Sequence, residues 1–215
     1  MSYRKACLLW IFIVFTVPVF AIDHIDKDKG RWELNYLDVT PKENVTAWYL
    51  PFSTSNRTDI RTISVISSFG SPRSSFLAGH IHTGLDCMPK NSKEPVNVFA
   101  MAEGTVCSVH LGDPFQTVVI KHRLKDSSIV YTSYKHINDV LVKAGDVVNK
   151  DTKIARVLTK KEAKRFGGAY NHLHLEIRKS FDDFGCASWL TMSKTELNLR
   201  FYNPKDFMKR NIINK

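Results

Sequence analysis

The chain has 215 residues and a formal net charge of +10 at pH 7. Hydrophobic residues make up 43% of it, which excludes disorder over most of the chain and fits one globular domain with appendages. The positive charge favours a polyanionic partner such as a cell-wall polymer, an acidic lipid or a nucleic acid, although an excess of lysine also serves solubility alone.

The first 21 residues have the pattern of a secretory signal peptide. Arg4 and Lys5 precede an apolar run that ends at Pro18, and Ala21 closes a small-residue cleavage site. The run is shorter than the roughly 20 residues of a membrane-spanning helix, which argues against the rival interpretation, an uncleaved anchor. The sequence predicts an exported protein, periplasmic or secreted, that meets the membrane through residues 1–21 alone. Export makes nucleic acid the least favoured partner, and none is expected.

Residues 22–60 are a mixed polar segment with scattered aromatic side chains. We expect an extended arm or accessory segment there, with no chemistry of its own. Residues 61–215 are predicted to form the main domain with a C-terminal extension. The sequence leaves the oligomeric state open.

Beyond residue 62 the chain consists of short β-rich runs between turn residues. The runs predict strands over 96–100, 104–110, 117–122, 128–134, 147–149, 153–158 and 172–177. Residues 160–165 fit one helical turn, and residues 188–199 fit a short helix. The pattern predicts a mainly β protein, an antiparallel β sandwich or partly open barrel with few short helices.

Three cysteines follow the predicted leader, namely Cys87, Cys107 and Cys186. An oxidising compartment permits disulfides, and an odd number leaves at least one cysteine free or paired with another molecule. Cys87 and Cys107 lie in strand-like segments joined by a modest loop, so the sequence favours a bridge between them. No C-x-x-C pair is present, which argues against zinc ligation by thiols.

The segment His172-Leu-His-Leu-Glu-Ile alternates polar and apolar residues. On a strand, His172, His174 and Glu176 share one face, while Leu173 and its apolar neighbours turn to the core. One imidazole can then bind a metal while the other reaches the substrate. A strand with a merely solvated polar face is the alternative.

The segment His82-Thr-Gly-Leu-Asp86 offers a second pair of metal ligands. Gly84 argues against a helix, so a turn entering a strand would bring His82 and Asp86 to one ion. The alternative is that Asp86 caps a turn and His82 is exposed. His80 forms another H-x-H pair with His82, but it falls one pleat earlier and is not expected to bind the metal.

His136 ends a predicted strand in the sequence Tyr134-Lys-His. A histidine at the end of a strand beside the site can act as a general acid or base, or stabilise an oxyanion. An ordinary loop histidine is the alternative. No comparable motif surrounds the other three histidines, which are predicted to be surface or strand residues: His24, His110 and His122.

Together, H-T-G-L-D, Y-K-H and H-L-H-L-E-I resemble the motifs of the lysostaphin/LytM-like zinc metallopeptidases. Residues 68–73, 98–106 and 144–148 resemble the segments that flank those motifs in the family. The resemblance covers roughly residues 64–179, in order and at sensible spacing.

The resemblance implies that His82, Asp86 and His174 hold a zinc ion and that His136 and His172 are the catalytic histidines. Three protein ligands leave a position open for water, as in catalytic zinc sites. The implied fold is an antiparallel β domain with a metal-bearing groove. The implied activity is hydrolysis of peptide bonds in bacterial cell-wall peptidoglycan. Which of His136 and His172 is the general base stays open.

Two segments depart from the family pattern. Residues 160–171 form a longer basic loop before H-L-H, and residues 180–199 form an insertion after the last predicted strand. Both are expected to border the groove and to affect the choice of substrate. A catalytically silent partner of a cell-wall hydrolase, and a secreted metallopeptidase that acts on protein, are the alternative functions.

Overall fold

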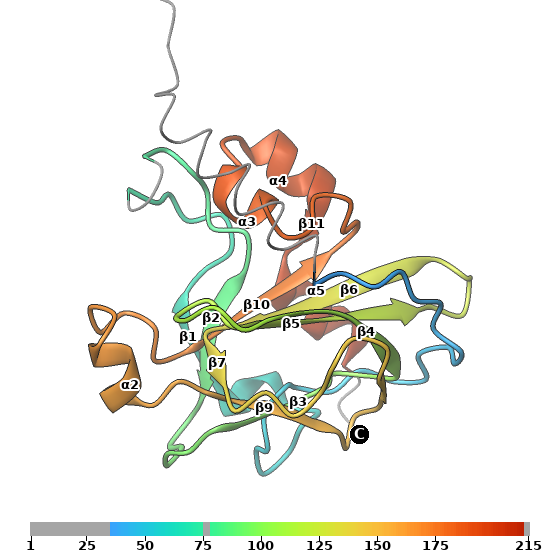
Figure 1. The fold of residues 1–215 in the computed structure, drawn as a ribbon, viewed down its shortest axis with the longest axis horizontal. Helices are drawn as coiled ribbons and strands as arrows, with labels where there is room; N and C mark the ends of the chain where they lie inside the picture. Colours follow the sequence, from blue (N-terminus) through green and yellow to red (C-terminus); the bar gives the residue numbers. More distant parts are fainter. Residues whose placement is uncertain (1–34, 75–77, 213–215) are drawn as a thin grey trace, which may run out of the picture.

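The computed structural model describes residues 35–74 and 78–212 (Figure 1). The predicted signal peptide and His24 lie outside the described residues. Within the part of the chain that is described, no helix is both long and apolar enough to cross a membrane.

The fold consists of two antiparallel sheets (Figure 1). The large sheet has the strand order β1-β2-β10-β6-β5-β4-β8, with β11 paired to β10, and the small sheet has the order β3-β9-β7. The strands are β1 (Ile63–Ser67), β2 (Leu85–Pro89), β3 (Asn97–Phe99), β4 (Gly104–His110), β5 (Thr117–Arg123), β6 (Ile129–Lys135), β7 (Ile137–Asn138), β8 (Val147–Val148), β9 (Lys153–Val157), β10 (Leu173–Arg178) and β11 (Phe201–Tyr202). This architecture confirms the predicted mainly β, antiparallel fold.

The helices are short (Figure 1). They are η1 (Ile60–Thr62), α2 (Lys160–Lys164), α3 (Ala187–Leu190), α4 (Lys194–Arg200) and α5 (Pro204–Asn211). The prediction of one helix over residues 188–199 was wrong. Thr191 and Ser193 have extended backbones, and the Ser193 side chain caps α4 by accepting from Glu196 N, so the segment divides into α3 and α4.

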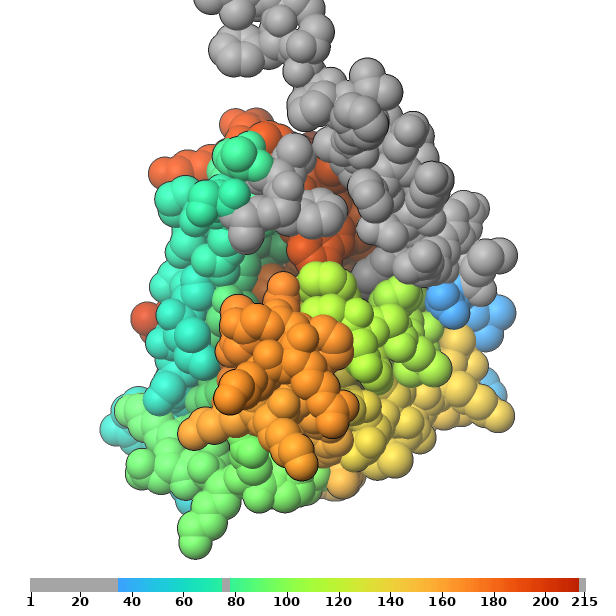
Figure 2. Space-filling view, turned by 60° about the vertical axis from the view of Figure 1, so that its left-hand side comes forward, coloured from blue at the N-terminus to red at the C-terminus, as the bar shows by residue number. Residues whose placement is uncertain are grey.

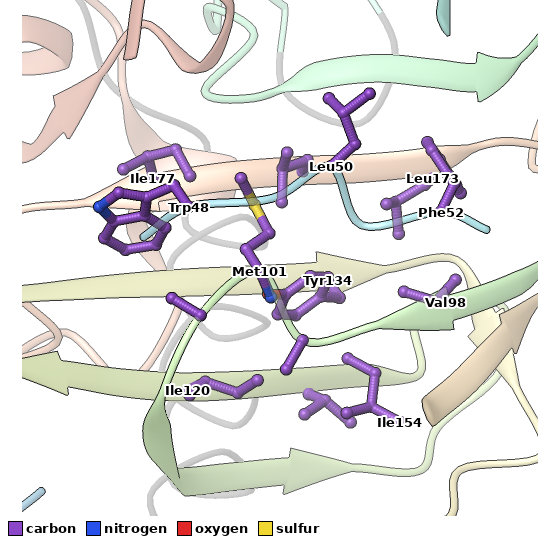
Figure 3. Close-up of a cluster of buried hydrophobic side chains, with 14 of the residues drawn as sticks. Trp48, Leu50, Phe52, Val98, Met101, Ile120, Tyr134, Ile154, Leu173 and Ile177 are labelled. Carbon is purple, nitrogen blue, oxygen red and sulfur yellow. The ribbon is translucent and has the colours of Figure 1, made fainter. Parts of the chain in front are cut away.

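The hydrophobic core lies between the two sheets and includes Leu173 and Ile177 of β10, Val98 of β3 and Ile154 of β9 (Figure 3). The side chains of β10 alternate, so residues 174, 176 and 178 turn to the opposite face of the large sheet. Those three residues are buried as well, since residues 180–201 contact Glu176 and Arg178 and the ring of His174 packs against Gly84.

The N-terminal segment from residue 35 packs into the same core. Trp48, Leu50 and Phe52 are buried beside β10 (Figure 3). Arg57 ties this segment to the rest of the domain by donating hydrogen bonds to the carbonyls of Leu50, Ala100 and Lys150. The described part of the predicted arm therefore contributes side chains to the core of the domain.

The predicted Cys87–Cys107 disulfide was wrong, because both cysteines are buried and neither forms a disulfide bond. Cys87 lies on β2 and Cys107 on β4, with three strands of the sheet between them. At about 4.8 Å per strand, their backbones are roughly 19 Å apart, far beyond the reach of a disulfide.

Candidate metal centre

The predicted ligands His82, Asp86 and His174 meet in one buried cluster. Asp86 on β2 and His174 on β10 are direct partners across adjacent strands, and His82 precedes β2 by three residues. His174 Nδ1 lies 2.9 Å from Asp86 Oδ1, and His82 Nε2 lies 3.0 Å from each of those atoms. Two nitrogens and one carboxylate oxygen therefore form a nearly equilateral triangle.

Hydrogen bonds on the far side of each ring fix which nitrogen faces this triangle. His82 Nδ1 donates to the carbonyl of Ser68 at 2.8 Å, and His174 Nε2 donates to Glu176 at 3.1 Å. In neutral rings, these bonds leave His82 Nε2 and His174 Nδ1 with lone pairs directed toward Asp86 Oδ1. Three electron pairs that converge on one point repel one another unless a cation lies between them.

The donor set and its size fit zinc. Ligand atoms about 2.0–2.2 Å from a tetrahedral zinc ion lie roughly 3.3 Å from one another. The triangle of His82, Asp86 and His174 has sides of 2.9–3.0 Å, so it needs to widen by a few tenths of an ångström. Three protein ligands of this kind leave one coordination position open, which is the arrangement of catalytic rather than structural zinc sites.

The surroundings of Asp86 favour its ionised form. Burial opposes ionisation of Asp86, but its contacts with the rings of His172, His174 and His82 outweigh burial and hold the pKa of the carboxyl well below its usual range. Burial also disfavours the charged form of His174, yet bonds to Asp86 and Glu176 raise its pKa. For His82, burial dominates and lowers the pKa.

Gly84 allows His174 to occupy its position. A Cβ added at this glycine would lie 2.7 Å from the ring of His174 and from the carbonyl oxygen of Leu175. Real Cβ atoms do not approach other atoms so closely. The glycine of H-T-G-L-D is therefore needed because the ligand of the neighbouring strand packs directly on its backbone.

Arg73 belongs to the site but was missed at the level of sequence. Its guanidinium donates to Asp86 Oδ2 at 3.0 Å, which leaves Oδ1 directed to the triangle. Arg73 precedes Asp86 by 13 residues in an irregular segment, and no periodic pattern links the two. An arginine just ahead of the first ligand was the one available signal.

The two predicted catalytic histidines lie beside the triangle. The ring of His136 is 5.1 Å from that of His172 and 6.0 Å from that of His174, centroid to centroid. His172 Nε2 lies 3.4 Å from Asp86 Oδ1. His136 Nδ1 donates to the carbonyl of Pro114 at 2.9 Å, which leaves Nε2 as the nitrogen with a lone pair in the neutral ring. The structure thus brings all five predicted residues together.

Strong burial governs the protonation of His136. Burial, followed by the nearby rings of His174 and His172, lowers the pKa of His136 well below its ordinary value. The residue has a left-handed backbone with φ of 64°, an uncommon conformation for a residue with a side chain. This backbone departure at the end of β6 turns the ring toward the site.

The site opens into a cavity of about 590 Å³. Phe115, Tyr170 and Trp189 form an aromatic wall on its His136 side, with Phe115 in edge contact with Tyr170 at 5.6 Å and with Trp189 at 4.8 Å. Tyr170 comes from the predicted long loop 160–171 and Trp189 from the insertion 180–199. Figure 2 shows the loop, in orange, against the lime-coloured segment that precedes β5. Both departures therefore border the cavity.

The remaining described histidines lie outside the triangle. His80 is buried and lines the cavity, but it does not join the ligand cluster. His110 lies on β4 and His122 on β5, and both are buried. Of the two predicted locations, surface or strand, both residues therefore have the strand location.

Comparisons with known proteins identify the family. Residues 80–185 match the model of peptidase family M23, and this range contains all five predicted site residues. A search among curated proteins finds no match. The fold is similar to a zinc-containing peptidase from Vibrio cholerae, at 22% identity over 62% of this chain and 37% of that one, with a TM-score of 0.44. The chain thus spans little more than a third of that peptidase.

Two further structures are similar over most of their length. The catalytic domain of the antimicrobial peptidase lysostaphin from Staphylococcus simulans is 18% identical over 69% of this chain and 94% of that one, with a TM-score of 0.46. LytU is 18% identical over 74% of this chain and 93% of that one, also with a TM-score of 0.46. The family model is the finding that identifies the chain: its residues 80–185 are a domain of peptidase family M23, the lysostaphin/LytM-like family.

Proposed function

We propose that this chain is an exported zinc metalloendopeptidase that hydrolyses peptide bonds of bacterial cell-wall peptidoglycan. One observation carries the proposal, namely the convergence of His82 Nε2, Asp86 Oδ1 and His174 Nδ1 within 3.0 Å of one another beside two further imidazoles. The match to peptidase family M23 supports the class of reaction.

The ligands in this proposal are His82, Asp86 and His174. When bound, zinc supplies Lewis acidity to a carbonyl oxygen and activates water at neutral pH. Arg73 keeps Asp86 oriented by holding its second oxygen. The hydrogen bonds to Ser68 and Glu176 hold the rings of His82 and His174 in the tautomers that a metal requires.

His136 is the proposed general base. Its Nδ1–H is committed to the Pro114 carbonyl, so Nε2 is the nitrogen that can accept a proton in the cavity. His172 is the proposed partner that stabilises charge developing on the substrate carbonyl oxygen, because its Nε2 lies at the site, 3.4 Å from Asp86 Oδ1, where an N–H can donate. The two imidazoles thus take different roles through their different hydrogen bonds.

The proposed substrate agrees with the charge of the chain. Removal of residues 1–21 takes away Arg4 and Lys5 and no acidic residue, so the formal charge falls from +10 to +8. A cationic surface favours contact with anionic envelope polymers.

Digestion of purified sacculi tests the proposal. The mature chain with zinc is expected to release soluble muropeptides, and mass spectrometry of the fragments identifies the bond that is cut. A chelator and His174→Ala are each expected to abolish release. His80→Ala serves as the control for zinc binding, since His80 shares the cavity but not the triangle. A chain that binds zinc and cuts a protein but no sacculus would favour a secreted peptidase acting on protein, and one that binds no zinc a silent regulator.

A further inference from the structure

We propose that Glu176 is a positioning residue of the metal centre, which fixes His174 for coordination through Nδ1, and that the insertion 180–199 in turn fixes Glu176. The inference rests on the proposed function in one respect, the assignment of His174 as a metal ligand. It assigns a role to Glu176, which lies on the polar face of H-L-H-L-E-I, and to residues 180–199, which depart from the family pattern.

One oxygen of Glu176 gathers donors from three separate segments. Glu176 Oε1 accepts from Thr83 Oγ1 at 2.6 Å, from Ser188 Oγ at 2.7 Å and from His174 Nε2 at 3.1 Å. Thr83 lies between the ligands of H-T-G-L-D, and Ser188 lies on α3 of the insertion. A single carboxylate therefore joins both ligand-bearing segments to the insertion.

The second oxygen of Glu176 is held by a buried arginine. Arg178 Nη1 donates to Glu176 Oε2 at 2.9 Å, and both side chains are 1% exposed or less. Asp183 pairs with the other terminal nitrogen of Arg178 and also accepts from the backbone N–H of Ala187 at the start of α3. The rings of Phe181 and Phe201 flank the guanidinium, at 5.2 and 4.7 Å from ring centroid to Cζ.

The hydrogen bond to Glu176 determines which nitrogen of His174 is available to a metal. A carboxylate accepts and does not donate, so the hydrogen on the His174 ring must lie on Nε2, and the lone pair must lie on Nδ1, inside the triangle. Partners of this kind set the tautomer, orientation and basicity of metal-binding histidines. The insertion reaches the metal centre through Ser188 and Asp183 and is therefore part of its support.

The amide of glutamine cannot replace this carboxylate. In Glu176→Gln, the amide NH₂ must face either Arg178 or the three donors at the other oxygen, and both positions already hold donors. A rotated amide oxygen or a displaced His174 is expected in either case. Loss of such a supporting partner typically weakens metal affinity by roughly 10–100-fold.

The test is the zinc affinity of purified variants, measured by competition with a chelator, together with the absorption spectrum of the Co²⁺-substituted protein. Glu176→Gln is expected to bind zinc about 10–100-fold more weakly than the unmodified chain and to shift the cobalt bands. Ser188→Ala is expected to lose several-fold in affinity. The matched control is Glu162→Gln, which alters another hydrogen-bonded carboxylate, one that accepts from Arg156, Thr159 and Asn138 instead of a proposed ligand. Its zinc affinity is expected to stay unchanged.

Equal zinc affinity in folded Glu176→Gln and the unmodified chain would overturn the inference, as would an equal loss in Glu162→Gln. If Glu176→Gln does not fold, the zinc affinity of Ser188→Ala tests the inference instead. An unchanged zinc affinity in Ser188→Ala overturns the role of the insertion. An unmodified chain that binds no zinc overturns the inference together with the metal site. A chain that binds zinc without cutting sacculi refutes the proposed function alone, because the affinity ratios are still measured.

Discussion

Asp86 and His174 face each other as register partners on β2 and β10, and their side chains bring Oδ1 and Nδ1 to 2.9 Å. Residues 88 positions apart in sequence thus supply two of the three proposed ligands from adjacent strands. His82 completes the set from the turn that enters β2. The sheet fixes two of the ligands, so the geometry of the site depends on strand register.

Asp86→Asn keeps the size of the side chain but removes its charge and one acceptor oxygen. Zinc affinity is expected to fall by at least about 100-fold, with loss of sacculus cleavage, because a neutral amide is a poor zinc ligand and Arg73 would compete for its single oxygen. Zinc retained on the protein after gel filtration measures the effect. His80→Ala should retain its zinc under the same conditions, and retention by Asp86→Asn would contradict the assignment of this ligand.

Gly84→Ala places a methyl group 2.7 Å from the ring of His174 and from the carbonyl oxygen of Leu175. Overpacking of this kind typically costs about 1–3 kcal/mol of stability. Because the ring must move, zinc affinity is expected to fall as well. Urea unfolding and chelator competition measure the two effects. A destabilised variant with unchanged zinc affinity would mean that the backbone, and not His174, absorbs the methyl group.

Trp189→Ala removes part of the aromatic wall. Its ring contacts Phe115 at 4.8 Å and lies 4.7 Å from Lys135 Nζ. We expect kcat/KM on sacculus-derived peptides to fall by roughly 10-fold, mainly through KM, with zinc affinity unchanged. Leu199→Ala, a change at a 72% exposed side chain of the same segment, is the control and should alter neither quantity. Equal KM in Trp189→Ala and the unmodified chain would exclude the wall from substrate binding.

The stability of the fold is expected to fall in mild acid because of His122. Burial lowers the pKa of His122 from 6.5 to about 4, while its ring bonds to the Glu103 carbonyl and to Thr132. Since the folded pKa lies below the unfolded one, the unfolded state takes up the proton first. The free energy of unfolding is therefore highest, as far as His122 is concerned, above pH 6.5. It decreases as the pH falls toward 4, by about 3 kcal/mol in all.

Urea unfolding at a series of pH values compares the unmodified chain with His122→Asn. The difference in unfolding free energy between the two is expected to shrink as the pH falls from 6.5 to 4. A difference that does not change with pH would show that His122 titrates alike in both states.

The sequence predicted the residues of the metal centre and the central strands better than the loops and edge elements around them. The central strands β4, β5, β6 and β10 lie within one residue of their predicted bounds, because alternation and β-branched residues mark them clearly. The five predicted site residues meet because their motifs sit on β2, β10 and the end of β6, which are neighbours in the sheet.

What could not be predicted depends on contacts between distant segments. β1 was missed, because it is an edge strand with exposed Ser64, Val65 and Ile66 and shows no alternation of burial. α5 was also missed, although the Asn203 cap followed by Pro204 is a recognisable helix start. The partners of Glu176 and the aromatic wall come from loops, and no local pattern links such residues.

Anomalous diffraction at the zinc edge, from crystals of the zinc-loaded chain, shows directly which residues bind the metal. We expect a single strong peak about 2 Å from His82 Nε2, Asp86 Oδ1 and His174 Nδ1, with no fourth protein ligand. A peak at other residues, or a fourth side chain that closes the coordination shell, would contradict that expectation.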